Sequence, residues 1–260
     1  RQVNVLYNVV DRMYIGHIPD IGALALTGVG VCMPIIMLIT AFAALVSMGS
    51  APRASVLMGR SDNEEAHYTL GNSFIMLIII ALVLTVFFRR FAEPILMAFG
   101  ASENTIGYAM DYMRIYTLGT IFVQFALGLN AFITAQGFAK ISMATVVIGA
   151  VINIVLDPIF IFGFHMGVKG AALATIIAQA VSAIWVLRFL TGKKTILKLQ
   201  KKYFRLKGSV VGPCLLLGMS PFIMQATESA ISVCFNSSLY RYGGDIAVGA
   251  MSILTSIMQF

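Results

Sequence analysis

The feature that most constrains this chain is the length of its uncharged stretches. Five stretches contain no Asp, Glu, Lys or Arg, and the shortest of them has 18 residues: 21–52, 68–88, 115–139, 170–187 and 208–227. A helix needs about 20 apolar residues to cross the roughly 30 Å hydrocarbon core of a bilayer. Most of the stretches meet that length, so the sequence predicts a polytopic membrane protein. Several such stretches in series also exclude a signal peptide as their explanation.

The spans are predicted to be helices. Lipid offers no water to backbone N–H and C=O groups, so a span must be a helix or part of a closed barrel. Barrel strands alternate apolar and polar residues over about 10 positions, whereas FIMLIIIALV at 74–83 does not alternate. Only 11% of the residues are charged, against about 25% in a typical soluble domain. We therefore expect an all-α integral membrane protein built as a helix bundle.

Turn residues and caps divide the chain into eight predicted helical segments. A capping box formed by Ser61 and Glu64 is expected to open the third, and Gly128, Gly149 and Gly218 are expected at close helix contacts. Both ends of the sequence lie inside apolar stretches, so we expect a fragment of a longer chain. The predicted segments are 1–15, 21–50, 64–90, 104–136, 141–163, 168–190, 208–240 and 245–260.

Three regions follow from these segments. Residues 1–190 are predicted to form a six-helix lobe, 191–207 a basic linker, and 208–260 the first two helices of a second lobe. A short internal similarity supports this division, because DIGALA at 20–25 and DIAVGA at 245–250 each open a predicted helix. If helices seven and eight repeat helices one and two, the molecule has the two similar halves common among transporters.

The positive charge is concentrated in one place. Segment 188–207 contains eight Lys and Arg residues and no acid, within a chain whose net charge is +7. Because basic loops of membrane proteins face the cytoplasm, we expect a multi-pass protein of the cell membrane with the 188–207 loop on the cytoplasmic side. That placement argues against nucleic acid as a partner. The loop either touches anionic lipid or is simply solvated. We expect a monomer whose partners are the bilayer and a small-molecule substrate.

Three acids stand out because they lie in or beside apolar spans, where a charge costs from about 2.5 to more than 10 kcal/mol. Of these, Asp157 gives the clearest prediction. Asn153 lies one helical turn before it, on the same face, and Pro158 leaves a backbone carbonyl unpaired one turn earlier. A carboxylate, an amide oxygen and a free carbonyl suit Na⁺, and a carboxylate alone suits H⁺. The alternative is an Asp157 that only fixes the packing of a neighbouring helix.

The other two acids are Asp11 and Glu228. Asp11 precedes Arg12, which would neutralise it near the outer interface if Asp11 had no other role. Glu228 follows the apolar stretch 208–227. It has three interpretations: a second proton carrier, a ligand for a cationic substrate, or a polar contact between helices.

The motifs that would indicate an enzyme or an ATP-driven pump are absent from the sequence. There is no GxxxxGK[ST] loop for ATP, and neither a Ser–His–Asp arrangement nor an HExxH motif is visible. The three cysteines, Cys32, Cys214 and Cys234, form no CxxC pair, so a zinc site or disulfide framework has little support. We expect a protein that is not an enzyme and has no cofactor.

Four short motifs resemble those of the multidrug and toxic compound extrusion family. They are NVVDRMYIG at 8–16, AQG at 135–137 followed by Lys140, NIVLDPIF at 153–160, and GVKGAA at 167–172. The resemblance spans nearly the whole chain. It implies a transporter of twelve helices in two pseudo-symmetric six-helix lobes, which exchanges its substrate for Na⁺ or H⁺. The chain is too short to include most of the second lobe.

The resemblance also implies a set of site residues. A cation site inside the first lobe corresponds to Asp11, Asn153, Asp157 and Thr175, and all four positions carry the expected residue type. Glu228 resembles an acid on helix seven that only some branches of the family use. The implied coupling ion, Na⁺ or H⁺, would bind at these oxygen-bearing side chains.

Taken together, these observations predict a secondary active antiporter that exports small amphipathic, cationic drugs or metabolites by alternating access. Coupling requires that the two conformations bind the cation with different affinity. One alternative keeps the fold and changes the cargo to a lipid-linked or other polar metabolite, as in a flippase. The other is a membrane scaffold that transports nothing.

Overall fold

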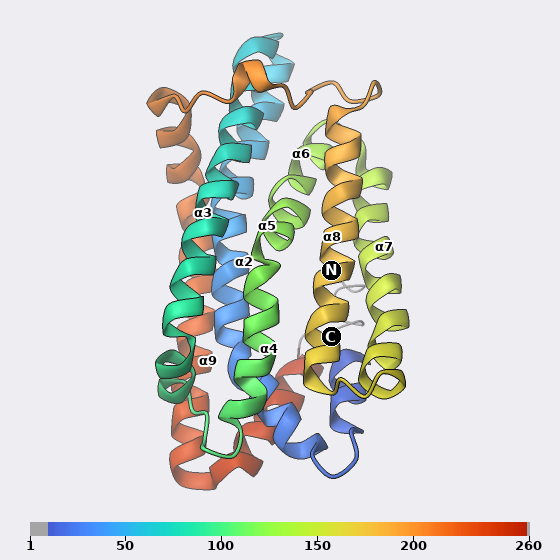
Figure 1. Cartoon of the computed structure of the whole chain (residues 1–260). Coiled ribbons are helices and arrows are strands. Elements are labelled where there is room, and N and C mark those ends of the chain that lie inside the picture. The colour runs from blue at the N-terminus through green and yellow to red at the C-terminus, as the bar shows by residue number, and fades with distance from the viewer. Residues whose placement is uncertain (1–9, 259–260) are drawn as a thin grey trace.

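The computed structural model describes residues 10–258, and within them every regular element is a helix (Figure 1). A short helical segment at 10–16 comes first, and the longer helices follow it. In chain order the elements are α2 (Gly22–Gly59), α3 (Asn63–Ala98), α4 (Ile106–Leu118), α5 (Thr120–Gly128), α6 (Asn130–Ala135), α7 (Ala139–Pro158), the π-helix η1 (Ile159–Gly163), α8 (Val168–Thr191), the 3₁₀ turn η2 (Lys201–Tyr203) and α9 (Gly208–Met258).

Five helices among the described residues are long and apolar enough to cross a membrane. They are α2, α3, α7 with η1, α8 and α9. A sixth crossing results if α4 is taken together with α5 and α6, which follow it after a bend of 59°. The predicted all-α membrane fold is therefore confirmed.

Several boundaries differ from the predicted segments: α2 ends at Gly59 and α3 at Ala98, not at 50 and 90. The segment expected at 104–136 is not one helix, because it breaks at Gly119 and again at Leu129. The separation predicted between 208–240 and 245–260 is confirmed, because α9 bends at Gly244, whose backbone is not helical (φ 65°, ψ −163°). Glycine tolerates that conformation at low steric cost. Of the segment predicted at 1–15, only residues 10–15 lie within the described part.

One predicted cap is wrong. Asp62, and not Ser61, is the N-cap of α3, and its side chain accepts a hydrogen bond from Glu65 N at 3.2 Å. Ser61 instead adopts a positive φ of 61° in the turn that leads to the cap. Ser61 and Asp62 are adjacent polar residues, and each has an acid three residues later, Glu64 or Glu65. The spacing of a capping box therefore fits either residue as the N-cap.

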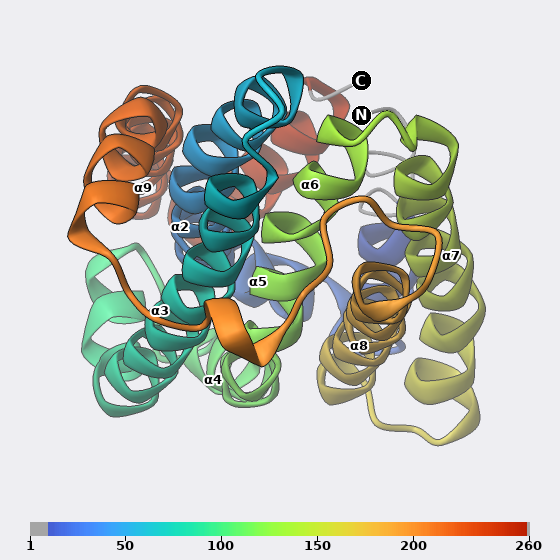
Figure 2. The same ribbon diagram turned by 90° about the horizontal axis from the view of Figure 1, so that it is seen from above.

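Helix α2 packs against α3 and α9 and also against α4 and α5 (Figures 1 and 2). It crosses α9 closely, because a Cβ atom at Gly49 would overlap the backbone of Cys214 and one at Gly218 would overlap the backbone of Leu45. Small residues permit such approaches where lipid provides no hydrophobic drive for association. The expectation of a close contact at Gly218 is thus confirmed.

The basic linker runs across one end of the bundle, from the end of α8 to the start of α9 (Figures 1 and 2). Three groups of the linker donate to Gln136 Oε1 at 2.8 Å each: Thr195 Oγ1, Ile196 N and Leu197 N. Leu197 is fully buried. The linker is therefore packed onto the helices and is not merely a solvated connection.

A second attachment holds the far end of the linker. Asn72 Oδ1, on α3, accepts a hydrogen bond from Lys207 N at 2.8 Å. The Lys207 ammonium lies 3.2 Å from the ring centroid of Tyr68, one turn earlier on α3. The backbone at both ends of the linker is thus tied to side chains of preceding helices.

Candidate cation site

The four side chains predicted for a cation site meet inside the bundle. Asp11 comes from the 10–16 segment, Asn153 and Asp157 from α7, and Thr175 from α8. Asn153 Nδ2 donates to Asp157 Oδ1 at 3.1 Å and to Thr175 Oγ1 at 3.4 Å. The carboxyl groups of Asp11 and Asp157 face each other closely enough to share a hydrogen bond when one of them carries a proton. Residues far apart in sequence are thereby brought into one cluster.

This cluster is buried and rich in unpaired oxygen atoms. Asp157 has no exposed surface, and Asn153 and Asp11 are 1% and 7% exposed. Asp11 Oδ1, Asn153 Oδ1 and Asp157 Oδ2 accept no hydrogen bond from the part of the chain that the structure describes. Buried polar atoms are normally paired because an unpaired one is costly. A proton or a small hard cation, which prefers oxygen ligands, would satisfy them.

The backbone changes its character directly after Asp157. Helix α7 ends at Pro158 and continues as the five-residue π-helix η1. Proline lacks the N–H that a helix requires and its ring displaces the carbonyl one turn earlier, so a change of hydrogen-bonding register at this point has a local cause. Such π-helical turns are rare and frequently occur at functional sites.

Tyr112 belongs to the cluster and was not predicted from the sequence. It lies on α4, is 4% exposed, and its hydroxyl shares a hydrogen bond with the Thr175 side chain. Its ring stacks against that of Tyr116, with centroids 5.9 Å apart. It also lies near enough to Asp11 to interact with it electrostatically. Tyr112 is one of three tyrosines spaced four residues apart on α4, with Tyr108 and Tyr116, and this spacing does not separate a site residue from a core aromatic.

Arg12 connects the cluster to the last helix. It is 8% exposed, and its guanidinium donates to the backbone carbonyl of Ser252 on α9. It also interacts electrostatically with Asp11 and Tyr112. Arg12 is therefore buried between helices, where its guanidinium has a backbone partner and lies near the Asp11 carboxylate.

A cavity of about 310 Å³ opens beside Asp11 and Arg12. Its wall contains one acid and one base, together with hydroxyl, amide and apolar groups. Its other lining residues are Val29, Met33, Ile36, Met37, Thr40, Tyr112, Tyr116, Val123, Leu127, Thr175 and Gln179. A molecule in this cavity would contact both the Asp11 carboxylate and aromatic and methionine side chains.

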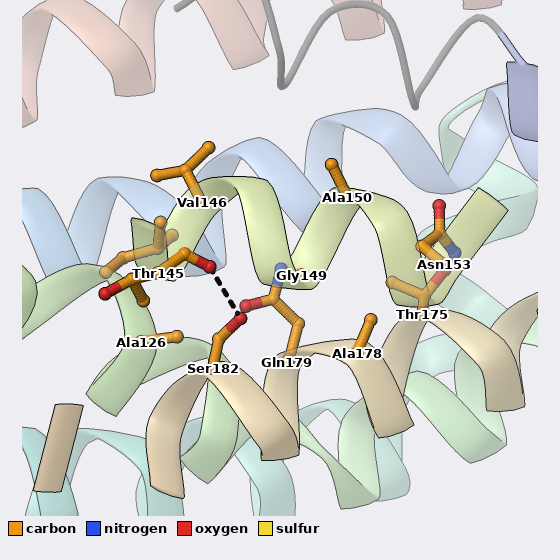
Figure 3. A pocket seen from close by; sticks show the side chains of 11 residues that line it. Ala126, Thr145, Val146, Gly149, Ala150, Asn153, Thr175, Ala178, Gln179 and Ser182 are labelled. Atoms are coloured by element: carbon orange, nitrogen blue, oxygen red, sulfur yellow. Dashed lines mark hydrogen bonds between the residues drawn. The ribbon is translucent and has the colours of Figure 1, made fainter. Parts of the chain in front are cut away.

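A smaller cavity, of about 40 Å³, extends from the cluster along the interface of α7 and α8 (Figure 3). Asn153 and Thr175 lie at one end of it, and Ser182 donates to the Thr145 carbonyl at 3.1 Å near the other. The side chain of Gln179 also points into this region. The space suffices for a water molecule, which needs about 10–15 Å³ by this measure and polar partners.

Glu228 is not part of this cluster. It is exposed on α9 and lines a separate cavity of about 500 Å³ together with Met37, Met48, Met224 and Gln225. The two larger cavities have one lining residue in common, Met37 of α2. The structure thus separates the two predicted acidic sites and places a flexible methionine between them.

Comparison with known proteins identifies the family. The family model named MatE matches residues 2–159, which is more than half of the chain. The chain is 29% identical over 261 residues to the multidrug export protein MepA of Staphylococcus haemolyticus, covering 99% of this chain and 56% of that protein. The chain therefore spans little more than half the length of this curated relative.

Solved structures agree with the sequence comparison. The MATE multidrug transporter DinF-BH superposes with a TM-score of 0.92 at 38% identity, over 99% of this chain and 57% of that one. An inward-facing multidrug resistance MATE transporter of the MOP superfamily also gives 0.92, at 26% identity over 98% of this chain and 57% of that one. Such proteins are transporters and not enzymes, as the missing catalytic motifs predicted. The chain belongs to the MATE family of membrane transporters.

Proposed function

We propose that the protein to which this chain belongs is a secondary active antiporter of the cell membrane. It exports small amphipathic, cationic compounds in exchange for Na⁺ or H⁺, and Asp11, Asn153, Asp157 and Thr175 hold the coupling ion. The observation that carries this proposal is the pair of facing, buried carboxyl groups with unpaired oxygen atoms around them. Its membership of a family of multidrug exporters supports the same conclusion.

The coupling mechanism follows from electrostatics. Two carboxylates that face each other away from water repel, because the interaction of like charges is poorly screened in a low dielectric. A proton or Na⁺ between Asp11 and Asp157 removes that repulsion and draws the 10–16 segment towards α7. Loss of the ion reverses the effect. If one transport conformation holds the two carboxyl groups together and the other separates them, ion binding shifts the equilibrium between them.

Arg12 provides a physical route from this site to the rest of the molecule. It follows Asp11 directly and donates to the Ser252 carbonyl on α9, in the region proposed to begin the second lobe (208–260). A movement of Asp11 on ion binding would therefore be transmitted to α9 through the adjacent residue. In this proposal residues 1–190 form the first lobe, and the 191–207 linker lies on the cytoplasmic side, as its charge favours.

The two neighbouring cavities are proposed to hold the cargo. Their volumes, about 310 and 500 Å³, lie in the range of about 300–1,000 Å³ that small-molecule sites occupy. Methionine side chains adapt to differently shaped apolar groups, and Met33, Met37, Met48 and Met224 contribute to these walls. Asp11 and Arg12 balance each other in the first cavity, whereas Glu228 lines the second together with uncharged side chains, which favours cationic cargo over a lipid-linked anion.

The test is gradient-driven dye efflux by the full-length protein in liposomes. Asp157→Asn should lower coupled efflux by at least an order of magnitude, since an amide can neither bind a proton nor balance Na⁺. Asp111→Asn is the matched control. It also removes one carboxylate, but from a half-exposed surface pair with Lys169 (3.4 Å), and it should leave efflux unchanged.

The same preparation separates the two ions. A Na⁺ gradient at uniform pH and a pH gradient without Na⁺ are imposed in turn, and only the coupling ion should drive efflux in the parent protein. Normal efflux by correctly folded Asp157→Asn would refute the proposed site. Failure of the parent protein to move any dye under either gradient would instead favour a scaffold, and movement of a lipid-linked substrate would favour a flippase.

A further inference from the structure

Two adjacent cavities on the outside of the bundle differ from the proposed cation site in charge and composition. The first, of about 490 Å³, lies between α3 and α4 and is lined by Arg89, Arg90 and Arg114. The second, of about 480 Å³, has walls of Leu82, Val83, Val86, Phe87, Arg90 and Phe91, and its exposed lining is entirely apolar. Arg90 and Phe91 line both cavities, so the basic cavity and the apolar groove adjoin each other.

The arginines of the basic cavity have few protein counter-charges. The ion pairs found among the described side chains join Arg53 to Glu65 and Lys169 to Asp111, and neither involves these three residues. Glu93 also lines the cavity, so three arginines and one glutamate leave a net charge of +2. All three arginines are exposed. The cavity is therefore suited to a ligand with at least one negative charge.

The three arginines lie at one depth in the membrane. The uncharged stretch 68–88 of α3 is about 30 Å long at 1.5 Å per residue, which matches the hydrocarbon core, and Arg89 and Arg90 follow it immediately. Thr85 Oγ1 donates to the Thr117 carbonyl at 3.1 Å, which fixes the register of α3 against the antiparallel α4. One turn further towards the same end lie Arg89 on α3 and Arg114 on α4.

The apolar groove extends from that level towards the middle of the membrane. Its residues Leu82, Val83, Val86 and Phe87 are 45–69% exposed, and they precede the arginines by one to two helical turns. A ligand with a charged group at the arginines and a hydrocarbon chain along these side chains would fill both cavities. Arginine binds phosphate through paired N–H donors, and a phospholipid supplies both parts.

We propose that the cavity formed by Arg89, Arg90 and Arg114 binds the phosphate of an anionic phospholipid, with one acyl chain in the groove from Leu82 to Phe87. The site lies on the membrane face opposite the basic linker. It does not depend on the identity of the coupling ion or of the cargo. It also differs from ordinary snorkelling of arginine towards an interface, because three arginines from two helices line one cavity.

The experiment is native mass spectrometry of the full-length protein in mild detergent, titrated with phosphatidylglycerol or with phosphatidylcholine. Phosphatidylglycerol should bind more tightly. A basic residue at a membrane surface contributes about fivefold to the affinity for an anionic lipid. Arg90→Gln should therefore weaken phosphatidylglycerol binding by about fivefold, and the triple change of Arg89, Arg90 and Arg114 to Gln by about a hundredfold. Binding of phosphatidylcholine should change much less.

Arg241→Gln is the matched control for Arg90→Gln. Both arginines are exposed on long helices and lie over the ring of the next residue, at 5.5 Å for Arg90–Phe91 and 5.9 Å for Arg241–Tyr242. Arg241 does not line the basic cavity, so its change should leave lipid binding as it was. If the triple variant does not fold, the comparison of the two single variants still decides the question.

Two further experiments distinguish a bound phospholipid from inorganic phosphate. Val86→Trp, which fills the groove with an apolar ring, should weaken phosphatidylglycerol binding while leaving the arginines in place. Inorganic phosphate at the same concentration should not displace the lipid. The proposal is overturned if Arg90→Gln and Arg241→Gln behave alike, if phosphatidylcholine binds as well as phosphatidylglycerol, or if inorganic phosphate competes and Val86→Trp has no effect.

Discussion

Asp157 and Glu228 look alike in the sequence and occupy opposite environments in the structure. Each is an acid at the end of an apolar stretch. Asp157 is fully buried on α7 and hydrogen-bonded to Asn153, whereas Glu228 is exposed on α9 and lines a wide cavity. A rare acid in an apolar span therefore indicates a function, but only the neighbouring helices decide which one. A dry, paired carboxyl group suits ion coupling, and an open one suits contact with a bound molecule.

The sharpest test of this contrast compares the two acids in the same efflux assay. Asp157→Asn should remove ion-driven efflux by at least tenfold for every dye, because the ion is common to all of them. Glu228→Gln should preserve the number of ions exchanged per dye and lower the apparent affinity for cationic dyes only. The measurement is the efflux rate of each variant for a set of neutral and cationic dyes. Equal loss for neutral and cationic dyes in Glu228→Gln would assign Glu228 to coupling as well.

A second test compares the packing around Asp157 on α7 with the packing of α9. Gly149 faces α8, and a Cβ atom there would lie 2.6 Å from Ser182 Oγ, while one at Gly212 on α9 would have nothing within 4 Å. Gly149→Val should lower the free energy of unfolding by about 1–3 kcal/mol, the usual cost of overpacking, and should fill the small cavity next to Asn153. Gly212→Val carries the same loss of backbone freedom without the clash. Thermal unfolding of the two variants should differ, and equal melting temperatures would mean that α7 and α8 separate easily.

The smallest expected effect concerns a single hydroxyl group. Tyr112→Phe removes the hydrogen bond to Thr175 and keeps the ring, so it should weaken ion binding by about 0.5–1.5 kcal/mol, the net contribution of a typical hydrogen bond. This corresponds to a severalfold higher ion concentration for half-maximal efflux. Tyr240→Phe, on the exposed surface of α9, is the control and should not change that concentration. An unaltered ion dependence in Tyr112→Phe would remove Tyr112 from the site.

Local spacing predicted the part of the site that lies on one helix. Asn153 and Asp157 are four residues apart, and helical geometry alone places them on one face, where Asn153 donates a hydrogen bond to Asp157. Their meeting with Asp11 and Thr175 was inferred only from resemblance to a family, since no periodicity relates residues 11, 157 and 175. Tyr112 was missed because contacts between α4 and α8 leave no pattern in a single sequence.

The fold shows the same division between local and long-range information. The length of the uncharged stretches predicted the long helices α2, α3 and α8 and their membrane class. The breaks at Gly119 and Leu129 were not predicted, because glycine in an apolar stretch also occurs inside straight helices that pack closely. The attachment of the basic linker to Gln136 was not predicted either. The charges of the loop predict the side of the membrane on which it lies, but they do not predict which helices it contacts.

That attachment limits where the molecule can bend. The linker is fastened to Gln136 near its start and to Asn72 at Lys207, so its many residues offer little slack. Lys207 is also bound to the start of α9, because its carbonyl accepts hydrogen bonds from Val210 N and Val211 N at 2.9 Å each. The fastening therefore extends into the first turn of α9, and a rotation of this helix against α3 has to break the Asn72 bond or bend α9 beyond that turn.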